Sequence, residues 1–176
     1  LPYMTRTLGI TNYGLYALVM SVMAYFTLIV GYGFRLTGTD KISKNIADPI
    51  SDHNIFWSTI WTKMVLLISC FGILCISALL VPAISVKFMF FLAGFLVIVG
   101  NVMIPDFYFL GIQKMKYITI ATTIGKIIIA ILIFTFVKTK NDVLYALLSN
   151  GIGTVIIGLI AFGFAMRSLK LEMVLP

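Results

Sequence analysis

The sequence predicts an all-α fold, namely a polytopic bundle of transmembrane helices. Two observations support this prediction. Hydrophobic residues make up 61% of the 176 residues and charged residues only 11%, whereas a soluble domain carries about 25% charged residues. The apolar residues gather in runs long enough for a helix to cross a bilayer, which takes about 20 residues. Because the hydrophilic connections are short, no soluble catalytic domain fits between the runs. We therefore expect residues 1–176 to form a single membrane domain.

Five complete spans follow from the positions of the apolar runs. Before them, residues 1–9 are expected to be the end of a preceding helix, and the absence of an initiator Met favours a fragment of a longer protein. The predicted spans cover residues 13–34, 56–81, 87–111, 117–137 and 142–166.

The longest connection, residues 35–54, is expected to carry a short helix at the membrane interface. Ile42 and Ile46 are four positions apart, as on one face of a helix, and Pro49 follows them. His53, the single histidine of the chain, is expected to be a solvated loop residue.

The distribution of Lys and Arg predicts which side of the membrane each connection faces. The richer side carries Arg35, Lys41, Lys44, Lys114, Lys116, Arg167 and Lys170. The poorer side carries Arg6, Lys87, Lys138 and Lys140. Cytoplasmic connections hold the excess of basic residues, so the richer side is predicted to be cytoplasmic. The net charge of +7 also suits contact with anionic membrane lipids.

Lys126 is the most unusual residue, because it lies in the middle of the otherwise uncharged run YITIATTIGKIIIAILIFTFV (117–137). A charge at this depth costs about 2.5–3.5 kcal/mol on insertion scales, and it usually faces a bundle interior or a wet cavity. Thr122 and Thr123 share its helix face. We expect this stripe to line a cavity for something anionic. The alternative is a buried structural lysine that pairs with a carboxylate or with backbone carbonyls.

Three further side chains are candidates for the same cavity. Lys63 follows Trp61 near the start of the second span, and its alternative role is to snorkel to the interface that the tryptophan marks. Arg6 precedes the first complete span. Tyr25 lies in that span and could stack on sugars, although helix packing explains it almost as well.

Two places in the spans are predicted to bend. Pro105 removes a helix hydrogen bond and should kink the third span, and Gly31 and Gly33 suggest bending or close approach near the end of the first. Asp106 follows the proline and is the only carboxylate well inside an apolar segment. It could pair with a lysine, bind a coupling cation or proton, or cap the broken helix, and the sequence leaves these three roles open.

The last span carries one face of small and polar residues, which indicates close helix packing in a membrane bundle. This face consists of Asn150, Thr154, Gly158, Ala161 and Ala165.

Several kinds of chemistry have no signature in this sequence. One histidine and two cysteines give no metal-ligand pattern, and neither a phosphate-binding glycine loop nor a nucleophile–base pair is present. Basic clusters with interleaved aromatic residues, typical of nucleic-acid binding, are also missing. We therefore expect a protein that moves a solute, not an enzyme, with no cofactor, no metal and no nucleic-acid partner.

Two segments carry a family resemblance. The opening LPYMTRTLGITNYGLYALVMSVMAYFTLIVGYGF (1–34) resembles that of Wzx-type polysaccharide flippases, and NVMIPDFYFLGIQKMKYIT (101–119) resembles their motif around a Pro-Asp pair. Lys126 matches a lysine that the family often carries in the following span. The likeness covers essentially the whole chain in order. It departs from the family pattern at Gly31, where the family has an acidic residue.

The resemblance implies a flippase of the multidrug/oligosaccharidyl-lipid/polysaccharide exporter superfamily, in the bacterial cytoplasmic membrane. The chain would be most of the amino-terminal six-helix half. Its substrate would be an undecaprenyl-pyrophosphate-linked oligosaccharide, and polysaccharide polymerase and ligase machinery would be candidate partners. Lys126, Arg6 and Lys63 would attract the anionic linker while the two halves rock to alternate access.

Two other functions remain open at the level of sequence. One is a multidrug or cation antiporter of the same superfamily, which needs acidic residues in its cavity where this chain offers mainly bases. The other is a non-transporting membrane subunit of a glycan-assembly complex, in which Lys126 would meet a fixed carboxylate in a dry core.

Overall fold

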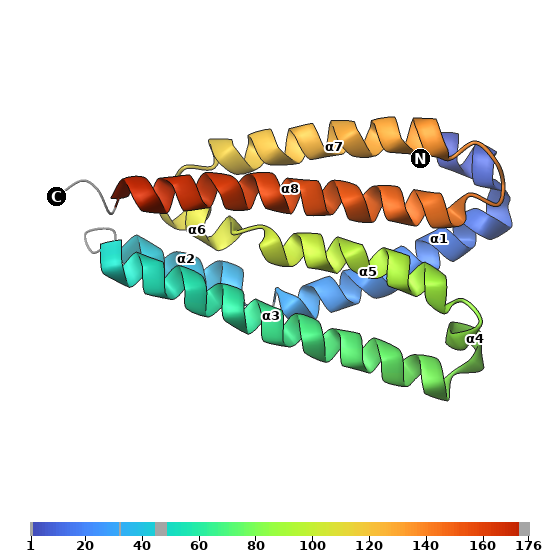
Figure 1. Ribbon diagram of the computed structural model, residues 1–176, viewed down its shortest axis with the longest axis horizontal. Helices are drawn as coiled ribbons and strands as arrows, with labels where there is room; N and C mark the ends of the chain where they lie inside the picture. Colours follow the sequence, from blue (N-terminus) through green and yellow to red (C-terminus); the bar gives the residue numbers. More distant parts are fainter. Residues whose placement is uncertain (1, 32, 45–48, 173–176) are drawn as a thin grey trace.

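The computed structural model describes residues 2–31, 33–44 and 49–172 as a bundle of helices, and no strand occurs in these ranges (Figure 1). The helices are α1 (Pro2–Val30), α2 (Phe34–Lys44), α3 (Pro49–Leu80), α4 (Pro82–Ser85), α5 (Phe88–Met103), α6 (Asp106–Gly111), α7 (Lys116–Phe136) and α8 (Val143–Glu172).

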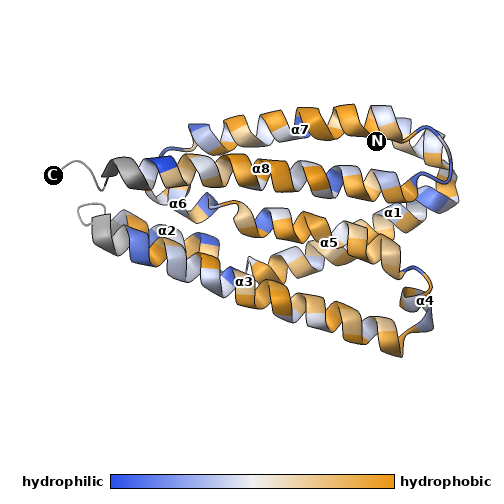
Figure 2. Cartoon of the chain, viewed as in Figure 1, coloured by the Kyte–Doolittle hydropathy of each residue, from blue (hydrophilic) through white to orange (hydrophobic). Residues whose placement is uncertain are grey.

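Five helical segments of the described chain are long and apolar enough to cross a membrane, which makes this a multi-pass membrane protein. Apolar residues dominate the long helices, and hydrophilic residues collect near the helix ends and connections (Figure 2). The all-α fold predicted from composition and run length is confirmed. Trp61 is 67% exposed on α3, and its place at the membrane interface stays a prediction.

Gly9 divides α1 into two helical pieces. Its backbone angles, φ 75° and ψ 168°, are not helical, and a positive φ of this kind is open mainly to glycine. The piece before Gly9 corresponds to the predicted end of a preceding helix. Tyr3 fixes this piece to the end of α7, because its hydroxyl donates to the carbonyl of Val137 at 2.8 Å and its ring contacts Phe134.

The first and third predicted spans are both broken near the ends that were predicted to be cytoplasmic. The first ends at Val30, and α2 begins at Phe34 directly after Gly33, whose φ is 69°. The third is two helices, α5 and α6, because Pro105 has no N–H and stands between them. The structure therefore shows a full break where the sequence predicted a kink.

The two short helices after these breaks, α2 and α6, pack against each other at one end of the bundle (Figure 1). Gly38 lets the ring of Phe107 approach α2, and Gly111 lets Ile42 approach α6. Ile42 is fully buried. The predicted interfacial helix is thus α2, with Ile42 on its buried face, while Ile46 lies outside the described residues.

His53 was predicted to be a solvated loop residue, and this is wrong. It lies in the first turns of α3, and its Nε2 accepts a hydrogen bond of 3.1 Å from Nε1 of Trp57. The reason is that α3 begins at Pro49, a favoured residue for the first turn of a helix, so that the helix includes residues assigned to the connection.

The most extensive helix contacts in the bundle are those of α8 with α5 and α7. Gly158 lies against the carbonyl of Gly100, which itself lies against Thr154, while Ala161 and Ala165 are fully buried. Small residues allow such close backbone approach between membrane helices. The close-packing face predicted for the last span is therefore confirmed. On the neighbouring side, Gly125 of α7 receives Ile157 of α8.

Candidate functional site

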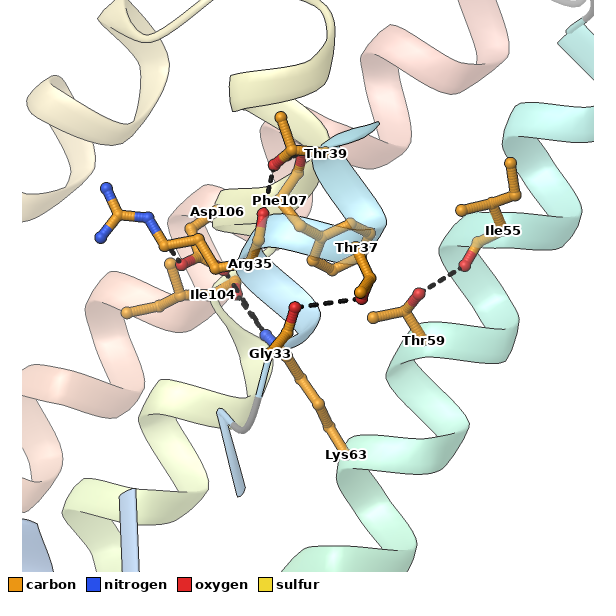
Figure 3. A network of polar contacts seen from close by, with 10 residues as sticks. All are labelled: Gly33, Arg35, Thr37, Thr39, Ile55, Thr59, Lys63, Ile104, Asp106 and Phe107. Atoms are coloured by element: carbon orange, nitrogen blue, oxygen red, sulfur yellow. Dashed lines mark hydrogen bonds and ion pairs between the residues drawn. The ribbon is translucent and has the colours of Figure 1, made fainter. Parts of the chain in front are cut away.

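Three charged side chains meet where α5 breaks into α6. Asp106 is the first residue of α6, Lys63 comes from the middle of α3, and Arg35 comes from the first turn of α2 (Figure 3). Nζ of Lys63 lies 3.5 Å from Oδ1 of Asp106, and Nε of Arg35 lies 4.0 Å from Oδ2. We call Lys63, Asp106 and Arg35 the charge cluster. Two helix breaks, at Gly31–Gly33 and at Pro105, position two of its three members.

Lys63 is the buried member of the charge cluster, with a side chain only 6% exposed. Its ammonium also donates to the carbonyl of Ile104 at 3.4 Å and lies 5.2 Å from the centre of the Phe107 ring. A buried ammonium is tolerated only when it is paired and hydrogen-bonded. Since Ile104 is the residue at which the helix is interrupted, the break itself supplies an acceptor for Lys63. In this structure the ammonium pairs inside the protein and does not reach the interface by snorkelling.

The charge cluster carries a surplus of one positive charge, because two cations share one carboxylate. Asp106 is 35% exposed and Arg35 is 66% exposed. Arg35 is therefore free to swing away from Asp106 toward another anion, whereas Lys63 is held in place. Of the three roles that the sequence left open for Asp106, the structure shows the pairing with a lysine, and that pairing is compatible with either of the other two.

A cavity of about 120 Å³ lies beside the charge cluster. Both Lys63 and Asp106 line it, together with the polar side chains of Thr27 and Asn101 and the backbone turn at Gly31. The cavity has room for several water molecules or a small ion. It places an ionisable pair, the amide of Asn101, the hydroxyl of Thr27 and the backbone at Gly31 around one space.

Lys126 lies elsewhere, on the exposed surface of α7. Ala121 and Gly125 are the residues that α7 buries against α8, and Lys126 points away from that contact. It makes no ion pair or hydrogen bond with any residue in the described ranges. Among the described residues, Lys126 is therefore not a buried lysine paired with a carboxylate, which was the alternative interpretation of the sequence.

The other predicted cavity residues are also separate from the charge cluster. Thr123 is exposed, while Thr122 is half-buried and donates to the carbonyls of Ile118 and Thr119 in its own helix. Arg6 and Tyr25 are exposed on α1. The structure therefore joins Lys63, Asp106, Gly31 and Pro105 in one site, and it leaves Lys126, Thr122, Thr123, Arg6 and Tyr25 on open surfaces of the bundle.

Sequence reasoning missed three members of this site. Arg35 was counted only as one of the cytoplasmic charges, and Thr27 and Asn101 were not singled out. The signal for Arg35 was its position two residues after Gly33, because a turn at that glycine brings the next helix back over the bundle. Asn101 had a weaker signal, as an amide in an apolar run four residues before Pro105.

Comparison with known proteins gives a consistent picture. Residues 1–176 match the family described as "Polysaccharide biosynthesis protein". A protein of Escherichia coli (strain K12) named "Putative O-antigen transporter" is 32% identical over 166 residues, which are 94% of this chain and 40% of the relative. One of the same name from Shigella dysenteriae is 32% identical over 161 residues, 92% of this chain and 40% of the relative. The chain thus spans about two fifths of the length of these relatives. No solved structure matches it.

Proposed function

Because this chain belongs to the family of polysaccharide biosynthesis proteins, we propose that the full-length protein is a flippase for lipid-linked oligosaccharides. Its substrate would be an oligosaccharide repeat unit linked to undecaprenyl pyrophosphate, and its location the bacterial cytoplasmic membrane. Both relatives carry O-antigen transporter in their names, which supports this class of substrate. The chain would supply part of the transport path, and no residue of it would perform covalent chemistry.

The observation that carries this proposal is the surplus of positive charge at the break between α5 and α6. A pyrophosphate is a strong acceptor of charge-assisted hydrogen bonds. Arg35 is exposed and only 4.0 Å from Asp106, so it can exchange its carboxylate partner for a phosphate oxygen. Lys126 offers an ammonium on the surface of α7 that has no ion pair or hydrogen bond among the described residues. In our proposal Lys126, with Arg6, attracts the linker, and Lys63 is reached when the pair with Asp106 opens.

Asp106 is the group through which an ion could drive this exchange. If it binds a proton or a cation in the cavity, the attraction that holds Lys63 and Arg35 weakens, and both become available to an anion. This role remains a proposal, supported by the exposure of the carboxylate to the same cavity as Lys63 and Asn101.

Alternating access would use the two breaks as flex points. Gly33 has the positive φ that glycine tolerates, and Pro105 leaves the backbone between α5 and α6 without a helical hydrogen bond. Because α2 and α6 pack on each other, bending at both breaks would move them together. Rocking of one half against another is the usual motion of transporters built from repeats.

Complementation tests the proposal. The full-length gene is returned to a flippase-null strain with Lys63→Ala, Lys126→Ala or the control Lys87→Ala, which removes an exposed charge from the opposite end of the bundle. We expect surface polysaccharide to fall at least tenfold for the first two variants at normal protein level, and lipid-linked repeat units to accumulate. Unchanged polysaccharide in both would refute the proposed roles of these lysines.

A scaffolding subunit of a glycan-assembly complex is the second candidate. The buried pairing of Lys63 with Asp106 is what such a structural role would also require. Polysaccharide polymerase or ligase machinery would then be the partner. A Lys63→Ala variant that loses polysaccharide but shows no accumulation of lipid-linked units, together with loss of a co-purifying polymerase, would favour this function over transport.

A further inference from the structure

A second polar cavity lies between α2 and α3 and shares no lining residue with the cavity of the charge cluster. Its volume is about 150 Å³. We propose that this cavity binds the phosphate group of an anionic membrane lipid. The proposal does not depend on what the protein transports.

The lining of the cavity has the chemistry of a phosphate site. Lys41 supplies an ammonium, and four hydroxyl groups surround the same space, while no acidic side chain lines it. The hydroxyls belong to Thr37 on α2 and to Ser58, Thr59 and Thr62 on α3. Thr37 and Thr59 lie close together between the two helices in Figure 3. Lys41 is exposed and makes no ion pair or hydrogen bond with another described residue, so its charge is available to a ligand.

The hydroxyl groups can donate to a phosphate at little cost. Each now donates to a carbonyl of its own helix, as in the bonds of Thr37 to Gly33 at 3.0 Å and of Thr62 to Ser58 at 2.7 Å. A helix carbonyl that loses such a bond keeps its backbone N–H partner. The carbonyl of Ile55 accepts from both Ser58 and Thr59, so the release of Ser58 leaves it still bonded to a hydroxyl.

The position of the cavity selects a lipid over a free phosphate ion. Trp61 lies one helical turn from Ser58 and is 67% exposed. Tryptophan side chains are enriched at the level of the lipid headgroups, because the indole ring has both an apolar body and a polar N–H. The cavity is at the end of the bundle that carries the excess of Lys and Arg, which the charge distribution makes cytoplasmic. Basic pockets between membrane helices on that side are suited to anionic headgroups.

Native mass spectrometry of the full-length protein tests this site. The protein is extracted in mild detergent and titrated with phosphatidylglycerol, or with the zwitterionic phosphatidylcholine. We expect at least one phosphatidylglycerol to be retained in preference to phosphatidylcholine. Lys41→Gln should weaken that retention about fivefold, and Lys41→Arg should restore it. Ser58→Ala combined with Thr62→Val should weaken it further, because two donors are removed.

Lys114→Gln is the matched control, because Lys114 is exposed at the same end of the bundle but does not line the cavity. Equal losses from Lys41→Gln and Lys114→Gln would overturn the proposal, since they would indicate general attraction to the surface. Equal retention of the two lipids by the wild-type protein would also overturn it. Displacement of the lipid by millimolar inorganic phosphate would show a site for the free ion instead, which contradicts the lipid proposal.

Discussion

At the scale of single residues, the electrostatics of the described chain depend on one shared carboxylate. Asp106 holds the buried ammonium of Lys63 at 3.5 Å and the exposed guanidinium of Arg35 at 4.0 Å. Loss of one partner of a buried pair is costly mainly because the other charge is left unpaired. The two cations differ in burial, so they should respond differently to a change at Asp106.

Asp106→Asn tests this dependence directly. It leaves the Lys63 ammonium with an amide oxygen and the Ile104 carbonyl, and we expect it to lower the free energy of unfolding by about 1–3 kcal/mol. Asp106→Asn combined with Lys63→Met should recover part of this loss, because no buried charge remains. Thermal unfolding of the full-length protein in detergent measures both. A double variant that is less stable than the single variant would contradict our account of the charge cluster.

Asp142 is a second residue whose ionisation matters, outside the membrane-spanning segments. The N–H groups of Thr139 and Lys138 donate to its Oδ2 at 2.7 and 3.0 Å, and they hold the pKa of this carboxyl below its usual value. A carboxyl with a lowered pKa stabilises the fold at pH values above its unfolded pKa, about 3.9. That contribution is lost as the pH falls through the lower pKa of the folded state.

We therefore expect the connection between α7 and α8 to loosen in acid. Hydrogen exchange at the amides of Lys138 and Thr139 should accelerate below about pH 4 relative to other amides, after correction for the intrinsic exchange rate. Asp142→Asn should exchange faster at neutral pH and lose this pH dependence. The same pH profile in wild type and variant would show that the carboxylate does not hold the connection.

At the scale of elements, glycines set how closely the helices approach. A Cβ at Gly158 would lie 2.6 Å from the carbonyl oxygen of Gly100 on α5, whereas one at Gly163, on the same helix, would meet nothing within 4 Å. The first position is a backbone contact that cannot move without separating α5 from α8. The second is open space, so Gly158 and Gly163 form a matched pair within α8.

Gly158→Ala should destabilise the protein by about 1–3 kcal/mol, the usual cost of overpacking a close contact. Gly163→Ala should be neutral or more stable by up to about 1 kcal/mol, because alanine is the better helix former. Thermal unfolding of the two variants in the same detergent compares them. If Gly163→Ala were the more damaging substitution, the packing of α8 described here would be wrong.

At the scale of the whole molecule, α7 is the helix whose surroundings this chain leaves least complete. Only Ala121 and Gly125 of α7 are buried. Lys126 is exposed, and isoleucines such as Ile127 and Ile131 are 55% and 58% exposed on another side of the helix. Because the chain covers 40% of the length of its relatives, we propose that the Lys126 side of α7 faces a water-filled path in the full-length protein, while the isoleucine side faces lipid.

Cysteine accessibility separates these two environments. In a full-length protein with Cys70 and Cys75 changed to alanine, Lys126→Cys and Thr122→Cys should react readily with a charged, water-soluble maleimide. Ile127→Cys is the control on the isoleucine side and should react at least tenfold more slowly, since a thiolate does not form in lipid. Equally slow reaction at positions 122, 126 and 127 would contradict a wet path beside Lys126.

The sequence by itself determined the class of fold, the presence of five long apolar segments, a disturbance of the helix at Pro105 and the close-packing face of α8. Each depends on local information: run length, a missing N–H, or small residues at helical spacing. Only the tertiary structure decided which charges meet. Lys63, Asp106 and Arg35 come from three separate helices. The residue pattern within one helix does not predict which residues of another helix it will contact. Their meeting required two helix breaks to turn α2 and α6 toward each other, and the burial of Lys63 followed from that contact.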